Sequence, residues 1–297
     1  MRIRCLIALL LIQVAAPARA DFQYQQNFDN LTTGRTQPSP GAAGQGGWYS
    51  VLAQNGGFGE IQNSIANSGR ALHQFTAATT PANLQTIDTV NLGTVDVNLL
   101  PQVALSFDFY GQTDNLSAVN SFIASMAANG GPFPGFEIVG VGIGAGNGAP
   151  KQTTGLNVAL GTFNGTNNNV LIPLSVGQRL AFGTWHSVSV AIDQGRDRYV
   201  SITVDGQTQD LSSYALVRSF DQGQPLRGHL IEKLTASLIP SDVGGNRTND
   251  SIYWDNIRLT AVPEPASLLM LALGLAGTAT FAARRLAGRP GQGEAGR

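Results

Sequence analysis

Carboxylate and histidine side chains are the residues of this chain that could carry out acid–base chemistry. Cleavage of a glycosidic bond needs an acid on one side of the bond and a base or nucleophile on the other. One β-strand can supply both groups in an E-x-D-x-x-E pattern, because alternate residues of a strand share a face. The glutamates between residues 21 and 260 are Glu60, Glu137 and Glu232, and none has a carboxylate two to four residues away. The sequence therefore lacks this pattern, although aspartates from separate strands could still converge.

Nucleophilic catalysis has no better support. His73, His186 and His229 are isolated along the chain, and no G-x-S-x-G motif is present. His186 follows Trp185 at the start of an expected strand, a position that favours a structural role. We therefore expect a protein that is not an enzyme.

Calcium binding is the other chemistry that the residue types could support, because Ca²⁺ prefers carboxylate and amide oxygens. Two loop segments, DQGRDR at 193–198 and SDVGGNRTNDS at 241–251, are rich in such oxygens. The candidate ligands are Asp193, Asp197, Asp242, Asn246 and Asp250. Neither segment follows the D-x-[DN]-x-[DN]-G calcium loop, and side-chain-stabilised turns explain the same residues without a metal. Both interpretations stay open.

The elements that must position these side chains are predicted to be β-strands. In VALSFDFY (103–110) the apolar residues share one face, and Ser106, Asp108 and Tyr110 share the other. Segments of similar length and β-branched or aromatic content are 136–144, 156–163, 185–193, 199–206 and 251–259.

Two local features refine this prediction. Asp205-Gly206 is a typical hairpin turn, and we expect Val200, Ile202 and Val204 of the preceding strand to face inward. Residues 118–135 could hold a short helix, but their Gly and Pro content favours a loop.

Many short strands with Gly-, Asn- and Asp-rich turns favour an all-β fold over a parallel α/β sheet. One domain at residues 21–260 fits this class, since single β-sandwiches reach this length. Residues 21–262 contain eleven basic and seventeen acidic side chains, a net charge of −6, dispersed along the chain. A nucleic-acid partner is not expected, because no basic stripe is present.

Residues 1–20 have the pattern of a secretory signal peptide. Two arginines precede an apolar run from Leu6 to Ala16, which is too short to span a bilayer. Ala18 and Ala20 form an A-x-A-like site, so we expect cleavage after Ala20. Cys5, the one cysteine of the chain, would be removed as well, which leaves neither disulfides nor thiolate metal sites.

Residues 266–283 are predicted to form one C-terminal transmembrane helix. They are 18 residues without a charge, and a helix of this length rises about 27 Å, enough for the hydrocarbon core. The basic tail at 284–297 begins with Arg284 and Arg285, and positive flanks stay in the cytoplasm, so the domain should face outward. A buried C-terminal helix and a permanent anchor are the alternatives.

The linker at 261–265 contains Pro263, Glu264 and Pro265, and its two prolines keep the backbone extended before the span. The order of Pro-Glu-Pro, apolar span and arginines resembles the PEP-CTERM sorting tail of Gram-negative bacteria. This resemblance implies a transient anchor in the inner membrane and removal of the tail by an exosortase. It also implies delivery to the cell surface or to the extracellular exopolysaccharide matrix of a biofilm.

Four further stretches resemble concanavalin A-like, laminin-G-type jelly rolls: GQGGWYS (44–50), IANSGRAL (65–72), GTWHSVSVAIDQGRDRYVSITVDGQ (183–207) and IYWDNIRL (252–259). The resemblance implies an antiparallel jelly-roll β-sandwich, often with a carbohydrate- or protein-binding face and a calcium ion at its rim.

Three functions therefore stay open. We expect a non-enzymatic surface or matrix protein that binds exopolysaccharide, which a groove lined with Trp, Tyr and Asn would favour. The alternative is a secreted glycan hydrolase or lyase on the same fold, which two or three carboxylates about 5 to 10 Å apart in a groove would favour. Absence of a groove would favour a purely structural matrix component.

Overall fold

The computed structural model describes most of the expected domain. The described residues are 23–36, 45–52, 58–76, 86–95, 102–113, 123–130, 136–144, 155–162, 170–216, 231–239, 242–243, 246–247 and 249–261. The chain divides into two compact units, Met1–Ala261 and Val262–Arg297, and every described residue belongs to the first. The expected signal peptide, Pro-Glu-Pro motif, apolar span and basic tail lie outside the described residues. Among the described residues, no helix is long and apolar enough to cross a membrane.

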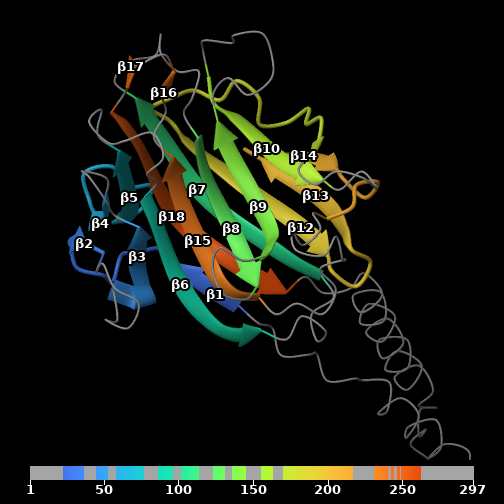
Figure 1. Cartoon of the computed structure of the whole chain (residues 1–297), viewed down its shortest axis with the longest axis horizontal. Coiled ribbons are helices and arrows are strands. Elements are labelled where there is room, and N and C mark those ends of the chain that lie inside the picture. The colour runs from blue at the N-terminus through green and yellow to red at the C-terminus, as the bar shows by residue number, and fades with distance from the viewer. Residues whose placement is uncertain are drawn as a thin grey trace, which may run out of the picture. The chain divides into compact units, whose positions relative to one another are not determined.

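The described strands form two antiparallel sheets that lie face to face (Figure 1). Sheet A contains, in spatial order, β14 (Gln207–Asp210), β13 (Arg198–Val204), β12 (Trp185–Asp193), β7 (Gln102–Thr113), β18 (Asp250–Ala261), β5 (Ala71–Thr76), β4 (Phe58–Gln62) and β2 (Gly34–Arg35), and β1 (Gln23–Gln26) also pairs with β18. Its two central strands, β7 and β18, are far apart in the sequence, so the final described strand completes the middle of the sheet.

Sheet B contains, in spatial order, β11 (Val170–Leu171), β10 (Asn157–Thr162), β9 (Phe136–Gly144), β8 (Ile123–Gly130), β15 (Ile231–Ile239), β6 (Thr86–Val95) and β3 (Trp48–Leu52). A 3-10 turn, η1 (Gln45–Gly47), precedes β3, and a small separate pair is formed by β16 (Asp242–Val243) and β17 (Asn246–Arg247). The architecture confirms the prediction of an all-β antiparallel sandwich.

The core fills the space between the two sheets. As predicted for β7, its four large aliphatic and phenylalanine side chains point inward and are at most 1% exposed; they are Val103, Leu105, Phe107 and Phe109. Phe107 packs edge-on against Trp254 of β18, with ring centroids 5.5 Å apart. Each such side chain stabilises the fold by about 1.5–3 kcal/mol through burial. The opposite face of β7 is thereby directed outward, because alternate residues of a strand point to opposite sides.

The expected loop at 118–135 is wrong in its central part, where β8 pairs with β9 on one side and β15 on the other. Ala124, Met126 and Ala128 alternate into the core and are completely buried. The strand forms because pairing on both edges outweighs the weak β-propensity of Ala and Asn. The other Gly and Pro residues of this segment come after Gly130 in the sequence, outside the strand.

The Asp205-Gly206 hairpin is confirmed, with both residues at positive φ (48° and 79°), as a two-residue turn of this kind requires. Val200, however, is only half-buried, and its expected inward orientation is wrong. The register between β12 and β13 shifts next to Ala191, so Tyr199 takes the inward position and is 1% exposed. A bulge of this kind adds one residue and reverses the alternation beyond it.

One polar network crosses the interior between the sheets and is centred on Asp88 of β6, which is completely buried. The hydroxyl oxygens of Thr36 and Ser50 lie 2.6 and 2.7 Å from Asp88 Oδ1, and Gln74 Nε2 donates to Oδ2 at 2.8 Å. Gln74 Oε1 accepts a hydrogen bond of 2.9 Å from Trp254 Nε1. Burial raises the pKa of Asp88, and the hydrogen bonds from Ser50, Thr36 and Gln74 oppose that rise.

Candidate functional site on the outer face of sheet A

Four rings from four neighbouring strands form a row across the outer face of sheet A. In the strand register, Trp185 lies opposite Tyr110, Tyr110 opposite Tyr253, and Tyr253 opposite His73. The centroid distances along the row are 5.7, 5.6 and 4.3 Å, and the rings of His73 and Tyr253 are stacked within 5° of parallel. We call these four residues the aromatic row. Directly opposed positions bring the rings together, and aromatic pairs at these distances stabilise one another.

Hydrogen bonds hold His73 in place at the β5 end of the aromatic row. Its Nδ1 lies 3.1 Å from Glu60 Oε1 on β4, and its Nε2 lies 3.2 Å from the hydroxyl of Ser251. Burial lowers the pKa of His73, and the hydrogen bond to Glu60 opposes this. A neutral ring that carries its proton on Nδ1 satisfies both contacts. Burial also raises the pKa of Tyr253. Both rings are therefore neutral stacking surfaces at pH 7.

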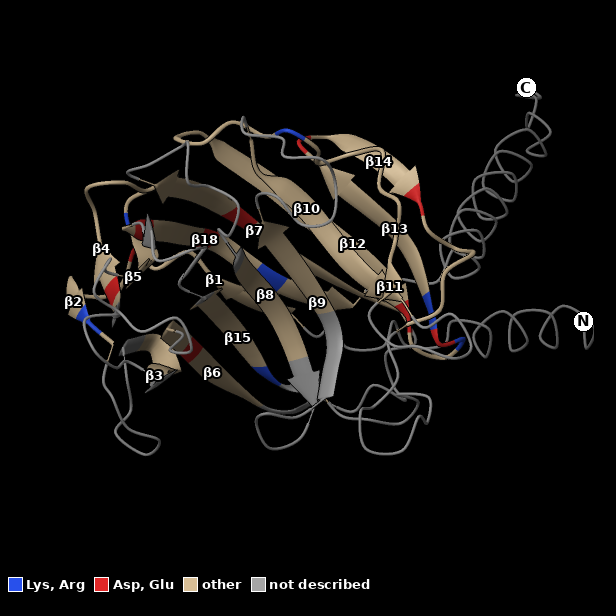
Figure 2. Ribbon diagram, turned by 45° about the horizontal axis from the view of Figure 1, so that its top comes forward, with Lys and Arg blue, Asp and Glu red and all other residues tan. Residues whose placement is uncertain are grey.

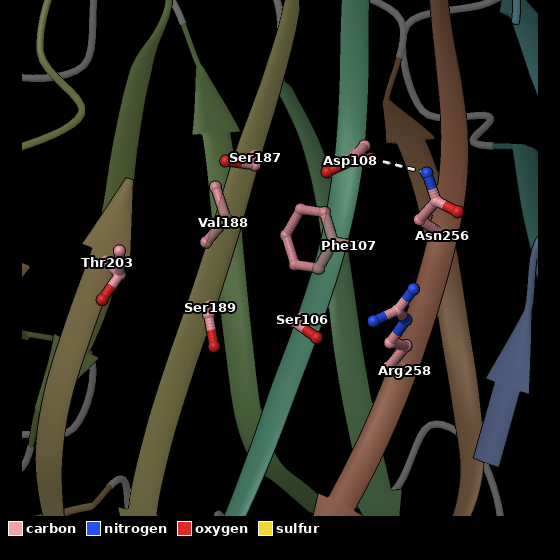
Figure 3. A pocket seen from close by; sticks show the side chains of 9 residues that line it. All are labelled: Ser106, Phe107, Asp108, Ser187, Val188, Ser189, Thr203, Asn256 and Arg258. Atoms are coloured by element: carbon pink, nitrogen blue, oxygen red, sulfur yellow. Dashed lines mark hydrogen bonds between the residues drawn. The ribbon is translucent and has the colours of Figure 1, made fainter. Parts of the chain in front are cut away.

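A polar groove of about 300 Å³ lies beside the aromatic row on the same face. Figure 3 shows the residues that line this groove. The residues that line it belong to β7, β12, β13 and β18. Phe107 and Val188 are among them, but their side chains are buried in the core on the other side of the sheet. The polar lining consists of Ser106, Asp108, Ser187, Ser189, Thr203, Asn256 and Arg258. Asp108 precedes Tyr110 by two positions on β7, and Ser187 follows Trp185 by two positions on the antiparallel strand β12. The groove and the row are therefore about 7 Å apart along the strands.

A bulge in β18 directs Arg258 into this groove. Relative to β7, the register of β18 shifts between Asp255, opposite Asp108, and Arg258, opposite Ser106. Asn256 takes up the extra residue at φ 50°, a conformation that Asn tolerates better than most residue types. The alternation reverses here, so Asp255 and Arg258 both lie on the outer side while Ile257 is completely buried.

Two aspartates at the bulge are held by donors from the chain. Asp108 Oδ2 accepts hydrogen bonds of 2.7 Å from the side-chain amides of Asn67 and Asn256. Asp255 is completely buried, and the backbone N–H groups of Ser68 and Asn256 donate to its two oxygens at 3.0 and 2.7 Å. Burial raises the pKa of Asp255 to about 6, the two backbone hydrogen bonds oppose this rise, and the charges of Asp29 and Asp108 add to it.

Apart from Thr203, whose hydroxyl lies 2.8 Å from that of Thr208, the remaining groups of the groove are not paired in this way. Within the described part of the chain, the side chains of Ser106, Ser187, Ser189 and Arg258 form no hydrogen bond or ion pair. Arg258 and Ser187 are exposed, and the other two serines are half-buried. These hydroxyl and guanidinium groups can therefore bind a ligand without breaking contacts inside the protein.

The predicted calcium ligands lie in two separate places. Asp193 pairs with Gln102 at one end of β7, and Asp250 pairs with Thr113 at its other end. Because β7 has 12 residues, these ends are roughly 36 Å apart. Asp197 lies in the turn after Asp193, whereas Asp242 and Asn246 lie in β16 and β17 before Asp250. The two loops therefore cannot share one ion. No group of three acidic, histidine or cysteine side chains in the described ranges is placed to hold a metal, and calcium binding stays a prediction.

His186, the other described histidine of the sequence argument, lies on the inner side of β12 and is 7% exposed. Its Nδ1 lies 2.8 Å from Asp205 Oδ2, and its Nε2 lies 3.0 Å from the carbonyl oxygen of Ala181. These contacts tie the start of β12 to the turn after β13, which supports the structural role expected for it. Charged residues are sparse on the ribbon of the described strands, and blue and red positions are scattered (Figure 2).

Comparison with protein families adds information on the C-terminus. Residues 261–285 match the family model of the PEP-CTERM protein-sorting motif. The chain carries a PEP-CTERM sorting motif. The matched range includes Pro263, Glu264, Pro265, Arg284 and Arg285, the residues on which the resemblance rested. A PEP-CTERM motif implies export, processing by an exosortase and attachment at the cell surface. Comparison with curated proteins found no match.

The solved structures similar to this chain include enzymes whose names state an action on carbohydrates. The endo-beta-1,4-glucuronan lyase of the fungus Trichoderma reesei is 14% identical with a TM-score of 0.49, over 82% of this chain and 96% of that one. Alginate lyase Aly36B is 16% identical with a TM-score of 0.45, over 80% and 96%. A carbohydrate esterase of the Shiga toxin-encoding bacteriophage phi24B is 15% identical with a TM-score of 0.44, over 79% and 100%. At these identities the similarity concerns the two-sheet fold and says nothing about activity.

Proposed function

We propose that this exported protein binds polysaccharide on the outer face of sheet A without cleaving it, after sorting to the cell surface or the exopolysaccharide matrix. The observation that carries the proposal is the aromatic row beside a polar groove whose three serine hydroxyls and Arg258 guanidinium have no partner in the described part of the chain. Binding sites for small polar ligands combine such apolar surfaces with a few oriented polar groups.

The two parts of the site match the two kinds of surface on a sugar. The C–H faces of a sugar ring are apolar and can lie against Trp185 and Tyr110, which are both half-buried. Sugar hydroxyls both donate and accept hydrogen bonds, as the groove requires: Asp108 accepts, Arg258 donates, and the serine hydroxyls do either. Because the row and the groove run side by side, neighbouring sugars of one polymer can occupy both.

The carboxylates at the groove support binding over hydrolysis. Asp108 is the one carboxylate among the residues that line it. Its cross-strand neighbour Asp255 is completely buried and is held by two backbone N–H groups, so it is not placed to touch a substrate. A glycosidase needs two carboxylates that flank the scissile bond. His73 is a poor base for a lyase reaction, because both of its ring nitrogens are engaged.

The test is a glycan array probed with the purified full chain and with the variant Trp185→Ala. We expect the variant to keep its fold and to bind at least about tenfold more weakly, because a stacking surface of this size is removed. Leu171→Ala on β11 is the matched control, since Leu171 is also a large apolar side chain, 56% exposed, but belongs to sheet B. Equal binding by wild type and Trp185→Ala would refute the proposed site.

The same samples separate the alternatives. New reducing ends or unsaturated sugar products in the incubated glycans would identify a hydrolase or lyase. A folded wild-type protein that binds no glycan would instead favour a purely structural matrix component.

Processing of the tail is tested separately, by replacing Pro263, Glu264 and Pro265 with alanine. Alanine is the best helix former, so the helix should extend upstream through the recognition site. We expect uncut protein to accumulate in the membrane fraction of cells that contain the exosortase. Release of this variant at the wild-type rate would show that the segment serves only as an anchor.

A further inference from the structure

We infer that the groove binds the carboxylate of an acidic sugar, with Arg258 as its partner. This inference rests on the proposed function and names the class of polysaccharide that the same site selects. Arg258 is the one cationic side chain among the residues that line the groove, and it is exposed there. It has no ion pair or hydrogen bond within the described part of the chain.

A bulge interrupts the regular alternation of side chains along β18, and this interruption places Arg258 in the groove. Without the bulge at Asn256, the alternation along β18 would turn residue 258 toward the core, where a lone guanidinium could not be buried. With the bulge, Ile257 and Leu259 enter the core instead, and both are completely buried. The same irregularity also brings the amide of Asn256 to Asp108. The bulge thus combines core packing with an outward arginine.

The surroundings of Arg258 favour a carboxylate over a neutral hydroxyl group. Ser106, Ser189 and Thr203 line the groove on the neighbouring strands and carry no charge. Asp108, the groove's own carboxylate, is held by two amides and forms no ion pair with Arg258. A guanidinium presents N–H groups in a planar fork that matches a carboxylate, and such charge-assisted hydrogen bonds are about twice as strong as neutral ones.

The overall acidity of the domain does not decide against an anionic ligand. The net charge of −6 is dispersed over residues 21–262, and at physiological salt exposed charges more than about 8 Å apart are largely screened. The local contact to Arg258 therefore outweighs the distant charges. Asp108 can still accept a hydrogen bond from a hydroxyl of the same or the next sugar, so the acidic group and the hydroxyls of the polymer have separate partners.

The test compares a polyuronate with the same polymer after reduction of its carboxyl groups to alcohols. We expect the full chain to bind the polyuronate about tenfold more tightly, and Arg258→Ala to bind both polymers equally, at the affinity of the reduced one. Arg258→Lys should keep part of the preference, since it retains the charge but loses the fork. Arg196→Ala is the control for a change in net charge, because Arg196 is 81% exposed at the β12–β13 turn, away from the groove.

A sulfated glucan, which is anionic but carries no carboxylate, distinguishes the carboxylate from anions in general. Equal or tighter binding of that polymer than of the polyuronate would overturn the assignment to carboxylates. A preference that persists in Arg258→Ala would overturn the role of Arg258. If wild type binds both the polyuronate and its reduced form equally, the inference fails while the proposed function stands. If the folded protein binds neither, both fail.

Discussion

The polar network between the two sheets and the polar groove on the outer face of sheet A differ in how many of their groups find partners. Between the sheets, both oxygens of Asp88 accept hydrogen bonds, and Gln74 contacts both Asp88 and Trp254. On the outer face, Asp108 is similarly held, but the groove serines and Arg258 have no partner in the described part of the chain.

This difference separates a structural network from a binding surface. An unpaired polar group that is buried destabilises a protein by about 1–3 kcal/mol, so each broken contact of the inner network lowers the stability of the fold. On the outer face, water satisfies the groups that the chain leaves unpaired, and a ligand can replace that water. Substitutions inside should therefore lower stability, and substitutions outside should lower binding.

The largest effect is expected for Gln74→Ala. This variant leaves Asp88 Oδ2, the carbonyl oxygen of Ala236 and the indole N–H of Trp254 without their shared partner. We expect the free energy of unfolding, measured with urea, to fall by about 3–5 kcal/mol. Gln207→Ala, at an exposed position of β14, should change it by less than about 0.5 kcal/mol. Similar values for the two variants would contradict the structural role of the inner network.

A smaller loss is expected for Gly59→Ala, which disturbs the inner network without removing a polar atom. A Cβ at residue 59 would lie 2.2 Å from Asp88 Oδ2, and the hydrogen bonds of Asp88 prevent it from moving aside. We expect the free energy of unfolding to fall by about 2–3 kcal/mol. Gly142→Ala is the control, since its Cβ would meet only Ala159, at 3.7 Å or more. The Gly142→Ala substitution should lower the free energy of unfolding by less than about 1 kcal/mol.

The change in the free energy of unfolding with pH should be smaller than the effects of Gln74→Ala and Gly59→Ala. The pKa of Asp255 is raised to about 6 from an ordinary 3.8, and that of Asp88 is also raised, in both cases mainly by burial. Each carboxyl group therefore binds its proton more tightly in the folded protein than in the unfolded one. The free energy of unfolding should rise as the pH falls from 7 toward 5, by about 1–2 kcal/mol for Asp255.

Urea unfolding at a series of pH values checks this, and Asp255→Asn should flatten the slope because its amide does not titrate. Asp210 is the control, since hydrogen bonds from Ser212 lower its pKa. Its contribution is lost only as the pH falls through that lowered pKa, so Asp210→Asn should leave the slope between pH 7 and about 5 unchanged. A stability that increases from pH 5 to 7 would contradict the assignment.

The sequence predicts the layers of this fold better than it predicts the site. The alternation in β7 was sufficient to place Asp108 and Tyr110 on the outer face, because strand periodicity and burial agree there. The aromatic row could not be predicted, because it depends on the register between strands far apart in the sequence. Arg258 was missed because one extra residue at Asn256 reverses the faces of β18, and the one signal for it is an Asn, a type that tolerates positive φ.

The smallest expected effects come from the same substitution at a serine of sheet B that faces the interior and at a serine of sheet A that lines the groove. Ser50→Ala removes a hydroxyl that is 2% exposed and lies 2.7 Å from Asp88 Oδ1, so we expect a loss of about 1 kcal/mol in the free energy of unfolding. Ser189→Ala removes a groove hydroxyl without a partner in the described part of the chain, and stability should change by less than about 0.5 kcal/mol.

Polysaccharide binding should show the reverse order for the same two serines. Ser189→Ala removes a group that can bond to a sugar hydroxyl, and a neutral hydrogen bond of this kind contributes about 0.5–1.5 kcal/mol, so affinity should fall by roughly two- to tenfold. Ser50→Ala should bind like wild type at temperatures where it is folded, because Ser50 lies between the sheets. Titration calorimetry and urea unfolding on the two proteins give the four values. Equal effects of the two variants on stability, or on affinity, would mean that the interior between the sheets and the outer face of sheet A do not divide folding from binding as their hydrogen bonds indicate.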